Sequence, residues 1–257
     1  MTTEALHHWI VVLDLETFST RSDPLQQFLR AAMYDVVRTA FEDCGLDARE
    51  IAMEDRGDGI LMLVPPSVSP VRLAGPLVRA LDDGLREKAR VHGEENSLRM
   101  RVALHQGLAA QDAHGWSGDA VNTAFRLVDA QPLRNVLRKA TLARLAFVVS
   151  EQVYDGVVRH GHRGLDPAAY LPMRFTTKHG ETLCGRVTVP GYSAPPGLPS
   201  AATAPQPAPA APTTGGTGAA ERPGAGSAGR VTDIRVRTVH GDVVGGDKHV
   251  HGPGTVS

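Results

Sequence analysis

The chain has 257 residues, enough for one large domain or two small ones at roughly 100–200 residues per domain. Hydrophobic residues make up 42% and charged residues 21%, so most of the chain can bury a core. Lys plus Arg total 27 and Asp plus Glu total 28, which gives a formal net charge of -1. A chain this close to neutral has no strong overall field to attract nucleic acid or an anionic membrane, and we expect neither as a partner.

The N-terminal sequence and the cysteine content indicate the cellular compartment. MTTEALHHWIVVLDLE carries Glu4 where a signal peptide needs Lys or Arg, and its apolar run stops at Asp14. No segment of the sequence reaches the ~20 apolar residues needed to cross a bilayer. Cys44 and Cys184 are too few for a disulfide framework and have no metal-like spacing. We therefore expect a soluble, cytoplasmic protein.

Composition divides the chain into three parts. Residues 1–190 mix helical and strand periodicities and should form the folded domain. Residues 191–229 are rich in Pro, Ala, Gly, Ser and Thr, so they bury too little apolar surface to offset the entropy cost of ordering. This composition predicts a flexible linker. Residues 230–257 alternate β-branched residues with Gly and polar residues, a pattern typical of strands and turns, but they are too few to form a domain alone.

The folded part begins with six elements in a recognisable order. Residues 8–16 are a buried-strand run, and residues 24–45 place apolar side chains at helical spacing. Residues 51–55 and 59–66 are two short apolar runs separated by a tight turn at 56–58, which predicts a hairpin. An amphipathic helix over 70–93 and a strand from 98 to 107 follow. The order β-α-β-β-α-β predicts an α+β fold of ferredoxin-like arrangement, an antiparallel sheet with both helices on one face.

Two carboxylates occupy positions that this sheet would bring together. Asp14 ends the first strand, and Asp58 lies at the hairpin tip between Gly57 and Gly59. Since the first and third strands of such a sheet are neighbours, both side chains can converge on one point. Convergent carboxylates beside glycines suit a hard cation such as Mg2+ carried with a nucleoside triphosphate. The alternative is that Asp58 is only a turn residue.

A third feature is the segment GWSGDAVNTAFRLVDA, which starts at Gly115. A helix is expected after the turn at Gly118 and Asp119, and it would place Asn122 and Arg126 four residues apart on one face. An amide beside a guanidinium can orient a sugar oxygen and neutralise charge on a phosphorus centre. The alternative is an ordinary solvated helix face.

Four segments together resemble the catalytic domain of class III nucleotidyl cyclases, the family of adenylate and guanylate cyclases, over roughly residues 8–190. VVLDLETFS at 11–19 is similar to the strand that binds the first metal ion, and EDRGDGILMLV at 54–64 to the hairpin that binds the second. RMRVALHQG at 99–107 resembles the strand that ends in His-x-Gly. SGDAVNTAFRL at 117–127 resembles the dimerisation and transition-state helix with its Val-Asn-x-x-x-Arg signature.

The resemblance implies a catalytic arrangement. Asp14 and Asp58, helped by the backbone carbonyl of Leu15, would hold two Mg2+ or Mn2+ ions. Asn122 would position the ribose, and Arg126 would face the charge that builds on the α-phosphoryl group. The family joins two antiparallel subunits so that metal ligands of one meet Asn and Arg of the other, which implies a homodimer. The implied reaction converts a ribonucleoside triphosphate to a 3',5'-cyclic monophosphate and pyrophosphate.

Base recognition and phosphate binding follow the family pattern less closely. Lys178, in TTKHGETL, lies where the family often places a phosphate-binding lysine, although an ordinary surface lysine is the alternative. Glu54 occupies the position of the base selector, and a carboxylate can accept from guanine or from the cytosine amino group. Gly115 stands at the second selector position, where the family usually has Asp or Cys. These departures leave both purine and pyrimidine nucleotides open.

Arg56 is a further departure, since the family usually has an apolar residue beside the second metal aspartate. Two interpretations are open. Arg56 could stabilise the hairpin by pairing with Asp55, or it could face the nucleotide.

The C-terminal residues 238–254, TVHGDVVGGDKHVHGPG, resemble short motifs that end some bacterial signalling proteins and assemble into amyloid-type stacks. Alternating Val and Gly with few charges would let copies pair edge to edge, which makes a homotypic partner possible; a disordered tail is the alternative. The sequence thus predicts a nucleotidyl cyclase of bacterial signalling or defence. The rival hypotheses are a catalytically silent cyclase-homology module that senses nucleotide or serves as an adaptor, and a dimeric scaffold for the tail.

Overall fold

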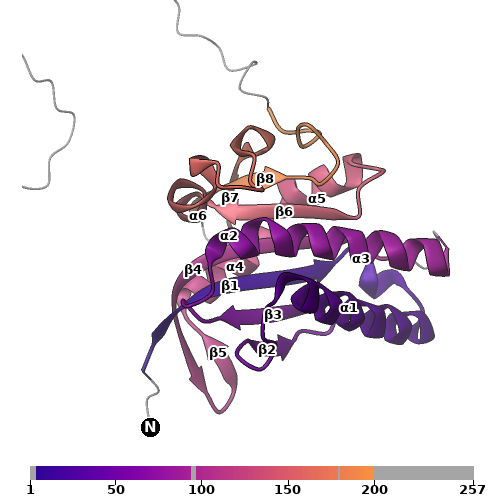
Figure 1. Ribbon diagram of the computed structural model, residues 1–257, viewed down its shortest axis with the longest axis horizontal. Helices are drawn as coiled ribbons and strands as arrows, with labels where there is room; N and C mark the ends of the chain where they lie inside the picture. Colours follow the sequence, from indigo (N-terminus) through magenta and orange to yellow (C-terminus); the bar gives the residue numbers. More distant parts are fainter. Residues whose placement is uncertain (1–3, 94–96, 179, 200–257) are drawn as a thin grey trace, which may run out of the picture. The chain divides into compact units, whose positions relative to one another are not determined.

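The computed structural model describes residues 4–93, 97–178 and 180–199 (Figure 1). Its strands are β1 (Leu6–Leu15), β2 (Ala52–Asp55), β3 (Gly59–Val64), β4 (Met100–Asp112), β5 (Gly115–Ser117), β6 (Leu145–Ser150), β7 (Leu171–Thr176) and β8 (Thr182–Thr188). Its α-helices are α1 (Asp23–Cys44), α2 (Pro70–Ala74), α3 (Pro76–His92), α4 (Asp119–Val128), α5 (Gln131–Lys139) and α6 (Glu151–Gly156). Short 3-10 helices are η1 (Phe18–Thr20), η3 (Val158–His160) and η4 (Pro167–Ala169).

The first half of the domain has the predicted β-α-β-β-α-β order. Its strands lie in the order β2-β3-β1-β4, and β1 pairs antiparallel with both β3 and β4. The first and third strands of the chain are therefore neighbours, as the ferredoxin-like arrangement requires. The prediction of an α+β, ferredoxin-like sheet is confirmed.

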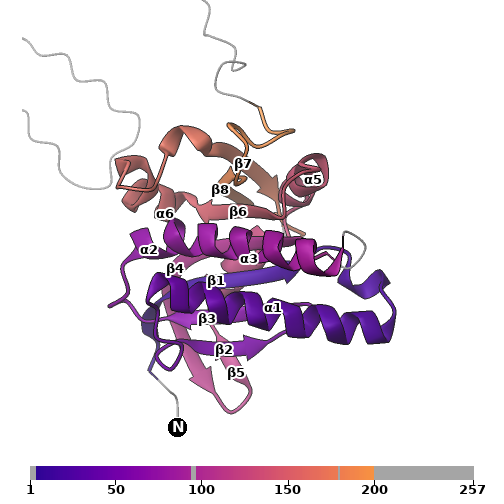
Figure 2. The same cartoon turned by 45° about the vertical axis from the view of Figure 1, so that its right-hand side comes forward.

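Helices cover both faces of the sheet because successive strand residues point to opposite sides. On β1, Val11 and Leu13 belong to the core beneath α1 and α3, which lie side by side in Figure 2. Ile10 and Val12 belong to a second core beneath α4 and α5. All of β3 is buried, which explains its uninterrupted apolar run. The prediction that the first two long helices share one face is confirmed by α1 and α3.

The segment predicted as one helix over 70–93 forms two. α2 stops at Gly75, whose φ of -118° and ψ of -82° lie outside the helical region, and α3 starts at Pro76. Proline has no N–H to continue a helical hydrogen-bond ladder, so a Gly-Pro pair is a natural break. The single-helix prediction was wrong at this point, because helical periodicity continues across the break.

The second half extends the sheet beyond the predicted elements. β6 pairs parallel with β4, and β8 and β7 follow as antiparallel neighbours. α5 lies between α4 and β6 in the chain and packs its buried leucine and valine side chains into the second core.

The described residues contain no helix long and apolar enough to span a membrane. The tail at 238–254 and most of the predicted linker lie outside the described residues. Tyr192 and Leu198, within the start of the predicted linker, pack against the second core. The domain boundary at residue 190 stays a prediction.

Candidate active site

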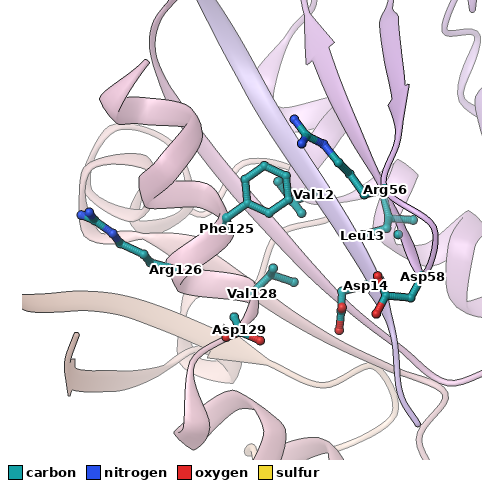
Figure 3. A pocket seen from close by; sticks show the side chains of 10 residues that line it. Val12, Leu13, Asp14, Arg56, Asp58, Phe125, Arg126, Val128 and Asp129 are labelled. Atoms are coloured by element: carbon teal, nitrogen blue, oxygen red, sulfur yellow. The ribbon is translucent and has the colours of Figure 1, made fainter. Parts of the chain in front are cut away.

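Asp14 and Asp58 lie beside each other at one end of β1. Asp14 is opposite Gly59 in the antiparallel register, and the N–H of Leu15 donates to the carbonyl oxygen of Asp58 over 2.8 Å. Both carboxylates line one cavity of about 370 Å³ (Figure 3). The structure thus brings together the two carboxylates that the sequence predicted to converge.

Two glycines shape the turn that holds Asp58. Gly57 has a φ of 82°, in the left-handed region that other residues rarely adopt. Gly59 lies so close to β1 that a Cβ atom there would be 2.2 Å from the carbonyl oxygen of Leu13. The structure therefore requires glycine on each side of Asp58.

Gly59→Ala should destabilise the domain by about 1–3 kcal/mol, because its new methyl group meets backbone that cannot rotate away. Denaturant unfolding measures the change. Gly156→Ala is the matched control, since a Cβ at Gly156 meets nothing within 4 Å and should cost little. If Gly59→Ala unfolds at the same denaturant concentration as the wild type, the close approach of β3 to β1 is refuted.

Arg101 on β4 is the main cationic neighbour of Asp14. Only 7% of Arg101 is exposed, and its Nη2 forms an ion pair with the Asp14 carboxylate. Burial raises the pKa of Asp14, Arg101 opposes this effect, and the nearby Asp58 carboxylate adds to it. The protein alone therefore compensates the Asp14 charge only in part, and a further cation at this point would stabilise the ionised form.

A second cavity, of about 470 Å³, also reaches both aspartates. It is lined by Asp14, Asp58 and Arg101 together with the segment from Leu15 to Ser19. Leu15, whose carbonyl the resemblance assigns to a metal ion, thus lies at the edge of the same space.

The two carboxylates fit a divalent ion that takes its remaining ligands from water and from a substrate. Within the described ranges, no cluster of three or more His, Cys, Asp or Glu side chains is placed to hold a metal ion. Two carboxylates and a backbone carbonyl are too few for a closed protein site. Mg2+ commonly binds through one or two carboxylates and completes its shell with water and substrate phosphates, and Asp14 and Asp58 match that pattern.

Asn122 and Arg126 lie one turn apart on α4, as the sequence predicted. Asn122 is exposed. Arg126 lines the first cavity, but its side chain points away from Asp14 and Asp58 (Figure 3). Its Nη1 donates to a carboxylate oxygen of Glu181 over 2.6 Å. A single subunit therefore does not direct this guanidinium at its own pair of aspartates.

Lys178 lies in the connection between β7 and β8. It lines a cavity of about 500 Å³ together with Arg126 and Thr177. The structure thus places Lys178 on the Arg126 side of the site.

The three residues predicted to contact substrate also gather in one place. The Glu54 carboxylate accepts from the backbone N–H of Trp116 over 3.3 Å and lies 3.1 Å from Arg56 Nη2. A Cβ atom on Gly115 would be 2.8 Å from the same carboxylate. The Arg56 guanidinium lies 5.2 Å from the centre of the Phe125 ring, at a wall of the first cavity.

The suggested pairing of Arg56 with Asp55 was wrong. Neighbouring strand residues point to opposite faces, so Asp55 faces α1, where it bonds to Arg30 and to the hydroxyl of Tyr34 over 2.6 Å. Arg56 shares a face with Glu54 and pairs with it instead.

Sequence reasoning missed Arg101 as a site residue. The signal was its position in β4, because Met100 to Leu104 are all buried and Arg101 is the charged member of that run. A charged residue in a fully buried strand needs a partner, which here is Asp14.

Several solved structures with a similar arrangement of helices and strands are cyclase domains. The guanylyl cyclase Cya2 is 13% identical and has a TM-score of 0.50, with 77% of this chain and 98% of that chain covered. The chain has the nucleotidyl cyclase fold. The guanylyl cyclase domain of the RhoGC fusion protein from Blastocladiella emersonii is 16% identical and has a TM-score of 0.48, with 74% of this chain and 98% of that chain covered. The adenylate/guanylate cyclase/hydrolase from Silicibacter pomeroyi is 13% identical and has a TM-score of 0.46, with 72% of this chain and 96% of that chain covered.

No protein-family model matches the sequence, and no curated protein matches it by sequence. The likeness to the cyclase fold therefore lies in the arrangement of helices and strands. The candidate active site is therefore supported by where its side chains lie in this structure, not by sequence similarity to a known cyclase.

Proposed function

We propose that this protein is a metal-dependent nucleotidyl cyclase, which converts a ribonucleoside triphosphate to a 3',5'-cyclic monophosphate and pyrophosphate. The observation that carries the proposal is the convergence of Asp14 and Asp58 on one cavity in a domain with the cyclase fold. The carboxylates alone would suit many cation sites, and the fold alone would suit an inactive relative. Their combination favours the enzyme over a silent module.

The reaction makes one bond and breaks one. The ribose 3'-oxygen bonds to the α-phosphorus, and the bond from that phosphorus to the bridging oxygen breaks. Pyrophosphate leaves with the electron pair, and the hydroxyl proton passes to water. Negative charge spreads over the α-phosphoryl oxygens, where the permanently charged Arg126 donates hydrogen bonds while the Asn122 amide orients the ribose.

Asp14, Asp58 and the carbonyl of Leu15 would hold two Mg2+ or Mn2+ ions. Such ions lower the pKa of the 3'-hydroxyl and stabilise the departing pyrophosphate. Lys178 would donate to the phosphates from the Arg126 side of the site.

Glu54, Arg56 and Gly115 would surround the base. A carboxylate accepts from the N–H groups of guanine or cytosine, and a guanidinium donates to ring nitrogens or carbonyl oxygens. Glu54 therefore offers hydrogen-bond acceptors and Arg56 offers donors, a combination that suits a purine or a pyrimidine. Gly115 leaves the second selector position without a side chain.

We also propose that the enzyme is a cytoplasmic homodimer of bacterial signalling or defence. The orientation of Arg126 away from the aspartates of its own chain supports a site shared between two subunits. The resemblance of residues 238–254 to self-assembling bacterial motifs supports the signalling role and a homotypic partner for the tail.

One assay tests the function. Purified protein is incubated with Mg2+ or Mn2+ and each of the four ribonucleoside triphosphates, and cyclic monophosphate and pyrophosphate are measured. We expect product with at least one nucleotide and none with Asp14→Ala. Nucleotide-dependent thermal stabilisation without product would refute the enzyme and favour the silent module. Neither effect, with function lost only on deletion of 238–254, would favour the scaffold.

Glu181→Gln should lower the KM for the triphosphate by about 2–5-fold, because it frees Arg126 from a partly exposed ion pair that competes with the substrate. Steady-state kinetics measure the change. Glu151→Gln, which breaks the comparable pair with Arg186, should leave the KM unaltered. An unchanged or higher KM in Glu181→Gln would show that the pair does not compete.

A further inference from the structure

Helix α5 places a row of polar side chains at the wall of the cavity that contains both aspartates. Gln131, Arg134 and Arg138 are three and four residues apart, so they lie on one face of the helix. All three line the 470 Å³ cavity with Asp14 and Asp58. The opposite face of α5 packs into the core, so the three polar side chains are held on the side of the helix that faces the cavity.

The two α5 arginines are not fully used by the protein. Arg134 pairs with Asp129 through one Nη atom, while its Nε is buried and has no hydrogen-bond partner among the described residues. Arg138 is exposed and bonds to the neutral side chain of Asn135. Both guanidinium groups therefore keep donors that the described part of the protein does not use, at the wall of the cavity that contains the aspartates.

The charges around this cavity suit a bound polyanion accompanied by cations. Asp14, Glu16, Asp58 and Asp129 oppose Arg101, Arg134 and Arg138, so the lining alone has a net charge of -1. Two divalent ions at the aspartates would change this net charge to about +3, which is close in magnitude to the negative charge of a triphosphate. Without the arginines the same ions would only cancel the carboxylates, and the phosphates would remain uncompensated.

We propose that Arg134 and Arg138 of α5 bind the terminal phosphates of the nucleoside triphosphate in the subunit that holds the metal ions. The identity of the substrate rests on the proposed function. Guanidinium groups suit this role because their planar donors bind phosphate oxygens in pairs. Gln131 adds a neutral donor at the same wall.

The test is a binding measurement that needs no turnover. Calorimetry in Mg2+ compares inorganic tripolyphosphate and the α,β-methylene analogues of the four ribonucleoside triphosphates on wild type and on Arg134→Gln/Arg138→Gln. We expect the double variant to bind each of them about 10–100-fold more weakly than the wild type, while nucleoside monophosphates bind to both equally. Arg38→Gln/Arg49→Gln is the matched control, because these arginines pair with Asp35 and Asp47 away from the cavity.

Equal binding of tripolyphosphate by wild type and the double variant overturns the proposal. Thermal melting establishes that the variants are folded. If the double variant does not fold, Arg138→Gln alone carries the test with an expected loss of about 3–10-fold, since Arg138 is exposed and has no role in the core. Arginine-dependent binding without cyclic product would refute the cyclase and keep the phosphate site. Product together with arginine-independent binding would refute the phosphate site alone.

Discussion

Asp58→Asn should reduce formation of the cyclic product by about 1,000-fold or more, equivalent to about 4 kcal/mol of transition-state stabilisation. Asn keeps the size of the side chain and one oxygen that can accept hydrogen bonds, but it removes the negative charge that attracts a divalent ion. Asp58 is exposed in a turn whose shape depends on Gly57 and Gly59, so the fold should survive. Initial rates with the preferred nucleotide at saturating Mg2+ measure the loss.

Asp43→Asn is the control for this prediction, because Asp43 is an exposed aspartate on α1 that lines neither aspartate cavity. It should retain full activity. Thermal melting should give the same midpoint for Asp58→Asn and wild type, which separates a chemical effect from unfolding. An Asp58→Asn enzyme that keeps more than half of the wild-type rate would remove Asp58 from the metal site.

The elements that the sequence predicted are those with local signals. Apolar periodicity located β1, α1 and β3, and Gly45, with a φ of 63°, ends α1 where the sequence placed its stop. Strand adjacency then followed from the order of elements, because a β-α-β-β-α-β unit puts its first and third strands side by side. That step alone was sufficient to bring Asp14 and Asp58 together.

The unpredicted features depend on contacts between distant parts of the chain. The pairing of Arg101 with Asp14 joins residues 87 positions apart, and although a charge in a buried strand signals that Arg101 needs a partner, no local pattern identifies Asp14 as that partner. α5 is short, and its arginines resemble an ordinary solvated face until the fold sets them opposite the aspartates. Of the two interpretations of Arg56, the pairing with Asp55 rested on adjacency in sequence alone, whereas strand alternation points Glu54 and Arg56 the same way.

Mixing Asp58→Ala with Asn122→Ala protein should restore about one quarter of the wild-type activity, although each variant alone is inactive. If metal ligands of one subunit face Asn122 and Arg126 of the other, about half of the dimers formed by free exchange are mixed, and each mixed dimer contains one intact site of two. Both substituted residues are exposed, so neither change should disturb the fold.

The same experiment decides between a shared site and a site within one chain. The first cavity contains Asp14, Asp58 and part of Arg126 in a single subunit, which is the geometry that a site within one chain would need. The direction of the Arg126 side chain, away from those aspartates and toward Glu181, favours the shared site. Differently tagged copies that co-purify establish that subunits have exchanged. With exchange established, activity that stays at the level of the separate variants would assign the aspartates and α4 of one chain to the same active site.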